Sequence, residues 1–121
     1  MERFVLAYDS GPSAEKAVDY LVSQPLLKGL ECHLLCVGKS GSKHEQSLRR
    51  AEQKLSAAGY EVEADLRPGD ADEVIGEAIN RDGADLLVMG AFGHSRIRQM
   101  IVGSTTAAMI RGTKRPVLLF R

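Results

Sequence analysis

The sequence predicts an α/β domain with helices on both faces of a parallel sheet, and three observations support this class. Short apolar runs closed by turn residues alternate with segments of helical periodicity. Together they give the order β-α-β-α-β-α-β-α-β, which is typical of parallel sheets with right-handed crossovers. Three of the runs, at 4–8, 32–37 and 86–89, are apolar almost throughout, as in strands buried on both faces. The length of 121 residues corresponds to a single domain spanning 1–121.

A strong turn signal separates the first strand from the first helix. Strand 4–8 ends at the sequence Asp-Ser-Gly-Pro, which occupies 9–12. The helix that follows is predicted to be capped by Gly11 or Ser13 and to end near Pro25. Its apolar residues recur at helical spacing and are Ala14, Ala17, Val18, Leu21 and Val22. Strand 32–37 comes next, and the polar segment 38–43 is predicted to be a loop.

The middle of the chain predicts two further helices and a strand with one polar face. The first of these helices has apolar residues at helical spacing, which are Leu48, Ala51, Leu55 and Ala58. Gly59 stands where a left-handed C-terminal residue belongs. Residues 60–66 alternate between apolar and acidic side chains, which places this strand near a sheet edge. Asp70 and Glu73 form a capping-box pattern at the start of the next helix, which ends by Gly83.

The stretch 86–106 carries the most specific pattern in the chain. Its apolar run ends at Gly90, Gly93 follows three residues later, and nine residues then precede Gly103 and Ser104. This spacing predicts a buried strand, a long loop and the N-terminus of a helix over 104–111, before a final strand at 116–120. Such a layout suits an anion, because unpaired backbone N–H groups and the positive end of the helix dipole face one point.

The predicted sheet gathers four loops at one edge. In a parallel α/β sheet, ligands bind at the carboxyl ends of the strands, where the strand order reverses. The loops at 9–12, 38–43, 67–70 and 90–102 lie at that edge. The last of them carries the cations His94, Arg96 and Arg98, whose roles stay open, and the cluster Arg111, Lys114 and Arg115 falls at the opposite edge.

Composition argues against several partners. The chain has 16 basic and 16 acidic residues, so net charge gives no attraction to nucleic acid or an anionic membrane. Cys32 and Cys36 would lie on one strand face roughly 13 Å apart, too far for a disulfide. We therefore expect reduced, buried thiols and a cytoplasmic location. We expect neither a signal peptide nor a membrane-spanning segment.

Neither a metal site nor a catalytic residue is assigned. His33 would face away from Cys32 and Cys36, so the three cannot converge on a metal, and His44 and His94 have no neighbours at ligand spacing. The loops at the carboxyl edge contain no His–Asp or Cys–His pair. Without a general base beyond an aspartate, fast hydrolysis of a bound ligand is not expected, although slow hydrolysis stays open.

The pattern Gly90-x2-Gly93-x9-Gly103-Ser104 resembles the nucleotide signature of the ATP-binding universal stress proteins. Asp9 at the end of the first strand, with the run 10–17 behind it, resembles the opening of that family. The resemblance covers essentially the whole chain. It implies a three-layer α/β/α fold of the Rossmann-like, adenine nucleotide alpha hydrolase-like type. The implied five-stranded parallel sheet has the order 3-2-1-4-5, with the nucleotide across strands 1 and 4.

The resemblance also implies which residues hold the nucleotide, ATP or else AMP or ADP. Adenine and ribose would lie beside Ala7 and Asp9, and Asp9 could help to hold Mg²⁺ through water. The remaining contacts would come from Val37, Met89, Gly90, Gly93, Gly103, Ser104, Thr105 and Thr106. Two departures from the family pattern concern the Ser10-Gly11 order, usually Gly-Ser, and Phe92, where a polar residue is common.

Three functions compete at this point. The resemblance favours a nucleotide-regulated stress-response module with slow or no ATP hydrolysis, and it allows the chain to be one half of a tandem stress protein. The alternative is a nucleotide-independent interaction module of the same fold. In either case the apolar last strand, Val117–Phe120, predicts a homodimer that pairs through an exposed edge. The alternative is a monomer in which Arg121 and a covering helix protect that edge. A phosphoacceptor receiver domain is disfavoured, because Asp9 stands without the clustered acids that such a domain needs.

Overall fold

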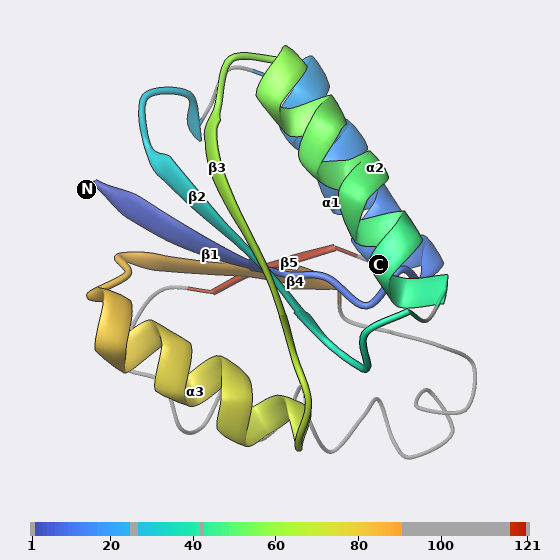
Figure 1. The fold of residues 1–121 in the computed structure, drawn as a ribbon. Helices are drawn as coiled ribbons and strands as arrows, with labels where there is room; N and C mark the ends of the chain where they lie inside the picture. Colours follow the sequence, from blue (N-terminus) through green and yellow to red (C-terminus); the bar gives the residue numbers. More distant parts are fainter. Residues whose placement is uncertain (1, 25–26, 42, 91–116, 121) are drawn as a thin grey trace.

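The computed structural model describes residues 2–24, 27–41, 43–90 and 117–120. Within these ranges, parallel strands form one sheet in the order β3-β2-β1-β4-β5 (Figure 1). The predicted parallel α/β class is thereby confirmed, while the helix predicted at 104–111 lies outside the described residues. In chain order the elements are β1 (Arg3–Ala7), α1 (Pro12–Ser23), β2 (Glu31–Val37), α2 (Lys43–Ala57), β3 (Glu61–Arg67), α3 (Ala71–Asp82), β4 (Leu86–Gly90) and β5 (Val117–Phe120).

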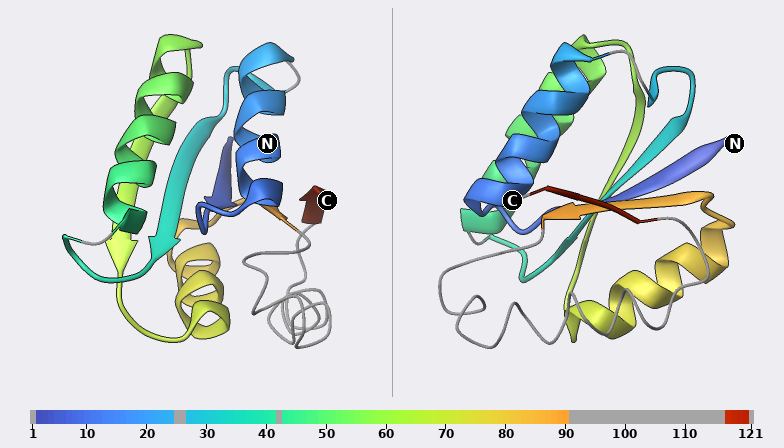
Figure 2. Two further views of the ribbon diagram at one scale, coloured as in Figure 1. Left: turned by 90° about the vertical axis from the view of Figure 1, so that its right-hand side faces the viewer. Right: turned by 180° about the vertical axis from the view of Figure 1, so that it is seen from behind.

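Helices pack on both faces of the sheet. α1 and α2 lie side by side on one face, and α3 lies on the other (Figures 1 and 2). Successive side chains of the central strand β1 point to opposite faces of the sheet. Phe4 and Leu6 pack in the core beneath α1 and α2, and Val5 packs in the core beneath α3. All three side chains are fully buried, as expected from an unbroken apolar strand covered on both faces.

β3 lies at one end of the sheet, and its two faces differ. Val62 and Leu66 pack against the core beneath α2. On the other face, Glu63 is exposed and the Asp65 carboxylate accepts a hydrogen bond of 2.6 Å from Nε of Arg67. The predicted edge strand with one polar face is confirmed, and its charged side chains discourage pairing with another chain.

The two ends of α1 are satisfied in different ways. Gly11 is its N-cap and Pro12 its first residue, but no side chain caps the helix. Ser13 is buried inside the first turn, so the predicted alternative of Ser13 as the cap is wrong. At the C-terminal end, the Leu21 carbonyl accepts a buried hydrogen bond of 2.8 Å from the Tyr60 hydroxyl. In a continuing helix the Leu21 carbonyl would accept a hydrogen bond from the backbone N–H of residue 25, but residue 25 is a proline and has no N–H. The Tyr60 hydroxyl supplies the donor instead.

α3 begins and ends where the sequence indicates, but not by the predicted cap. Asp70 is the N-cap residue, yet its side chain makes no capping hydrogen bond, so the capping box with Glu73 does not form. Gly83 closes the helix in the left-handed conformation, with φ of 64°. α2 begins at Lys43, the last residue of the predicted loop, and Gly59 beyond its end also has positive φ, at 104°.

Both cysteines are free thiols buried under α1 and α2. Burial raises the pKa of Cys32 to about 12. Burial, with a smaller contribution from the charge of Asp9, raises the pKa of Cys36 to about 11. Both groups are therefore neutral and unreactive at physiological pH, as the sequence predicted for structural cysteines.

Candidate functional site

The carboxyl ends of three strands meet at one edge of the sheet. Ala7 at the end of β1 is in register with Leu35 of β2 on one side and with Met89 of β4 on the other. The chain leaves β1 toward β2 and returns to the sheet at β4, so the strand order reverses between β1 and β4. A hydrogen bond of 2.8 Å from the Tyr8 N–H to the Leu35 carbonyl extends the pairing beyond β1. This reversal point is the place where open α/β sheets bind ligands.

The turn after β1 is held by the carboxylate of Asp9. Oδ1 of Asp9 accepts a hydrogen bond of 2.8 Å from the N–H of Gly11. Ser10 between them has φ of 63°, whereas Gly11 has φ of −80°. The left-handed residue is therefore Ser10, although the sequence supplies glycine one position later. An Asx-type bond across the turn is the sort of local contact that lets a non-glycine residue hold this conformation.

Ser10 contacts a histidine from a different element. Its Oγ lies 3.0 Å from Nδ1 of His44, in the first turn of α2. The ring of His44 lies over Gly38, where a Cβ would be 3.5 Å from the ring carbon Cδ2, an ordinary contact. Sequence reasoning placed both loops at this edge but did not pair the two residues. The sequence did contain a hint of this contact, because Ser10 follows β1 and His44 follows β2, and these two strands are neighbours in the sheet.

Gly90 at the end of β4 packs directly against the start of α1. A Cβ at this position would lie 2.6 Å from Cβ of Ser13 and 3.0 Å from the backbone nitrogen of Ala14. No side chain fits there without a shift in β4 or in α1. Gly90 therefore brings the end of β4 against the first turn of α1, where backbone N–H groups lack helical partners.

The structure brings several of the predicted site residues together. Ala7, Asp9, Val37 and Gly90 lie at the ends of adjacent strands, and all are partly accessible. Met89 is buried, with 6% of its surface exposed, and it packs in the core under α3. The other predicted residues lie outside the described ranges and are Gly93, Gly103, Ser104, Thr105 and Thr106.

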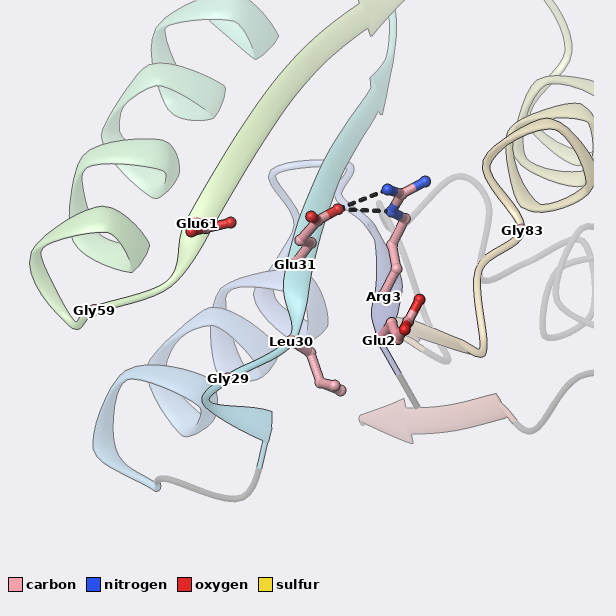
Figure 3. A pocket seen from close by; sticks show the side chains of 8 residues that line it. All are labelled: Glu2, Arg3, Gly29, Leu30, Glu31, Gly59, Glu61 and Gly83. Carbon is pink, nitrogen blue, oxygen red and sulfur yellow. Dashed lines mark hydrogen bonds and ion pairs between the residues drawn. The ribbon is translucent and has the colours of Figure 1, made fainter.

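A hollow of about 570 Å³ lies at the opposite, amino-terminal edge of the sheet (Figure 3). The turns that lead into β2, β3 and β4 surround it. Glu2, Glu31 and Glu61 contribute carboxylates to its lining, and Arg3 pairs with Glu31 at 2.7 Å. The net negative lining disfavours a phosphate group there. A second hollow of about 600 Å³, whose lining includes Lys39 and Arg49, opens beside the carboxyl end of β2.

Two negative findings concern the described part of the chain. No helix there is long and apolar enough to cross a membrane. The same ranges contain no group of three or more histidine, cysteine, aspartate or glutamate side chains placed to hold a metal ion.

Residues 37–121 match the sequence model of the Universal stress protein family. The chain belongs to this family. A relative, universal stress protein Slr1230 of Synechocystis, is 40% identical over 121 residues, which cover 98% of this chain and 42% of that protein. Universal stress protein MJ0577 of Methanocaldococcus jannaschii is 23% identical over 77 residues, which cover 64% of this chain and 48% of that protein. The matched segments thus span less than half of each relative.

Solved universal stress protein structures have the same fold. The MJ0577 structure superposes with a TM-score of 0.85 at 23% identity, covering 99% of this chain and 96% of that one. A universal stress protein in complex with cAMP gives a TM-score of 0.80 at 26% identity, with the same coverage. One from Archaeoglobus fulgidus in complex with dAMP gives 0.73 at 20% identity, covering 100% and 98%. The last two of these structures are thus complexes of family members with adenine nucleotides.

Proposed function

We propose that this universal stress protein domain binds ATP, or AMP or ADP, across the carboxyl ends of β1 and β4 and acts as a nucleotide-regulated stress-response module. The observation that carries the proposal is the meeting of Asp9, the close-packed Gly90 and the first turn of α1 at the reversal point of the sheet. The nucleotide complexes of other family members support it. A cytoplasmic location is part of the proposal, supported by two free, buried thiols.

Each part of the nucleotide has a suitable partner in this arrangement. Adenine is apolar on its faces, and Ala7 and Val37 offer apolar surface beside it. Asp9 uses Oδ1 to hold its own turn, and its carboxylate has a second oxygen for a ribose hydroxyl or for a water of Mg²⁺. Phosphates suit the Gly90–Gly103 loop and the hydroxyls that follow it, because glycine lets backbone N–H groups approach an anion closely.

Mg²⁺ fits this donor set only together with the nucleotide. The ion is usually held by one or two carboxylates, several waters and the phosphates of the substrate. Asp9 supplies one carboxylate, which is enough for an ion that is also coordinated by the nucleotide phosphates but too few for a site made by the protein alone. Hydrolysis of the bound nucleotide is expected to be slow or absent, because Oδ1 of Asp9, the candidate base beside the ribose, is already engaged in holding its own turn.

The test is calorimetric titration with ATP and Mg²⁺ of the natural chain and two glycine-to-valine variants. Gly103→Val places a branched side chain where the phosphates would lie, and it should abolish the heat of binding. Gly29→Val is the matched control at the opposite edge, because Gly29 has φ of 97° and a Cβ there would meet no other atom within 4 Å. It strains its own turn but should leave binding unchanged.

Two results would contradict the proposal. The first is the absence of heat and of a thermal shift at millimolar ATP, because a binding ligand must stabilise the folded state. The second is equal loss of binding in both variants while circular dichroism shows folded protein, because the effect would then not be specific to the carboxyl edge.

A second candidate, assembly without nucleotide, rests on the position of β5. This strand is last in the sheet order and pairs with β4 along one side. We propose a homodimer in which β5 of each copy pairs through its other side, since unpaired strand edges invite such contacts. Light scattering should give the mass of two chains with and without ATP. A monomer under both conditions would rule out this assembly.

A further inference from the structure

The turn after β1 is supported by a contact from outside it. Ser10 has φ of 63°, a left-handed conformation that a non-glycine residue keeps only where its surroundings enforce it. One support is local, because the Gly11 N–H donates a hydrogen bond of 2.8 Å to Oδ1 of Asp9. The other comes from the first turn of α2, where Nδ1 of His44 lies 3.0 Å from Oγ of Ser10. The left-handed residue is therefore held both by its own turn and by a second element.

His44 is seated on ordered parts of the fold. Leu48, one turn later in α2, is fully buried and fixes the helix to the core. The ring of His44 lies over Gly38, where a Cβ would be 3.5 Å from the ring carbon Cδ2. The N–H of Gly38 in turn donates a hydrogen bond of 2.8 Å to the carbonyl of Arg67, the last residue of β3. Through His44, the turn after β1 is thus tied to α2 and to the end of β3.

The contact between Ser10 and His44 is compatible with more than one protonation state. When Nε2 carries the ring proton, Nδ1 accepts a hydrogen bond from the Ser10 hydroxyl. When Nδ1 is protonated, it donates to Oγ of Ser10 instead. The support that His44 gives to the turn therefore does not require one particular tautomer.

We propose that His44 is a positioning residue of the nucleotide site, which acts through Ser10 on the carboxylate of Asp9. The importance of Asp9 rests on the proposed function. The hydrogen bond from Gly11 to Asp9 spans Ser10, so the direction of this bond and the orientation of the carboxylate follow the conformation of Ser10. By holding Ser10, His44 raises the fraction of molecules in which the carboxylate is already oriented for the ligand. A ligand that binds only this arrangement loses affinity in proportion as that fraction falls.

Substitutions at the two positions distinguish this role from a general loss of structure. His44→Leu removes the hydrogen bond but keeps an apolar side chain over Gly38. His44→Asn keeps the bond, because the side-chain amide of asparagine can place a nitrogen or an oxygen near the position of Nδ1. Ser10→Ala leaves a left-handed residue without its contact. Ser10→Gly removes the contact and also the need for it, because glycine takes positive φ without steric cost. Gln46→Leu is the control, at an exposed position two residues further along α2.

The measurement is calorimetric titration of each chain with ATP and Mg²⁺, beside urea unfolding to check that each is folded. His44→Leu and Ser10→Ala are each expected to weaken ATP binding about 3- to 10-fold, the contribution of one hydrogen bond. His44→Asn, Ser10→Gly and Gln46→Leu should each stay within about 2-fold of the natural chain. In the Ser10→Gly background, His44→Leu should cause no further loss, because its effect passes through residue 10.

The last of these comparisons excludes a merely structural role of His44. Such a role would lower stability and affinity together and would persist in the Ser10→Gly background, which would overturn the proposal. ATP binding of natural strength in a folded His44→Leu variant would also overturn it, and nucleotide binding itself would still stand. If the natural chain binds no ATP, the proposed function fails and the positioning role falls with it.

The test does not depend on the folding of one variant. Should His44→Leu not fold, Ser10→Ala and Ser10→Gly decide, because both lack the serine hydroxyl and only glycine is free to be left-handed. Tighter ATP binding by Ser10→Gly than by Ser10→Ala supports the proposal. Equal affinity of these two variants would show that the conformation of residue 10 does not influence the site.

Discussion

The close approach of Gly90 to α1 gives a steric prediction for the variant Gly90→Ala. The added Cβ would lie 2.6 Å from Cβ of Ser13, about 1 Å closer than carbon atoms pack in ordinary contact. It would also lie 3.0 Å from the backbone nitrogen of Ala14, so rotation of one side chain cannot relieve the overlap. The end of β4 or the first turn of α1 must therefore move.

The expected loss is about 1–3 kcal/mol of unfolding free energy, the usual penalty for overpacking a close contact. Lower entropy of the unfolded chain offsets about 0.4–1 kcal/mol of this, because alanine is less flexible than glycine. The net loss of unfolding free energy is then roughly 1–2 kcal/mol. For a domain of this size, each kcal/mol lowers the melting temperature by about 3–6 °C. Urea unfolding followed by circular dichroism measures it.

A double-mutant cycle identifies the contact responsible. Ser13→Gly removes the atom closest to the new methyl group, so the double variant should recover part of the loss, with a coupling of at least about 0.5 kcal/mol. Unchanged stability in Gly90→Ala would refute the steric reasoning. If ATP binding were lost at the same time, the glycine would serve the ligand alone and not the packing of β4 on α1.

Three further predictions concern the core and the surface. Tyr60→Phe leaves a buried helix carbonyl without its donor and should cost about 1–3 kcal/mol in urea unfolding, whereas no change would mean that water replaces the hydroxyl. Because burial raises the pKa of Cys32 to about 12 and of Cys36 to about 11, the folded state keeps protons that the unfolded chain releases above the ordinary value of 9.0. Unfolding free energy should therefore fall as pH rises from 9 toward 11, and both thiols should react with Ellman's reagent at neutral pH only after denaturation; rapid reaction of the native protein would contradict their burial. Glu31→Gln should change stability by less than about 1 kcal/mol, because its ion pair with Arg3 is exposed, with 39% of the arginine and 52% of the glutamate side chain accessible.

The sequence was informative wherever local pattern and burial agree. The apolar run of β1 is unbroken because helices cover both of its faces. In β3 apolar and acidic residues alternate because only one of its faces packs against the core. Gly83 is left-handed where a helix has to end. These features depend on residues close in the chain, which is why spacing alone predicts them.

The site was harder to predict because its geometry comes from tertiary contacts. Ser10 and His44 are 34 residues apart, and only the pairing of β1 with β2 brings them together. The sequence places glycine at position 11 of this turn, but the left-handed residue is Ser10, in a turn closed by the Asp9 carboxylate. Likewise Gly90, expected to serve a nucleotide, is also required by the packing of α1, which no spacing rule indicates.

The order of the strands also determines when the sheet can be completed during synthesis. β1 obtains its first neighbour when β2 emerges, but its second neighbour is β4, in which Leu86 pairs with Phe4. Most of the chain must therefore leave the ribosome before the central strand is enclosed. Until then an apolar strand has one unpaired edge, a state that is prone to association with other nascent chains. Folding should be limited by this late, long-range closure and not by formation of the helices.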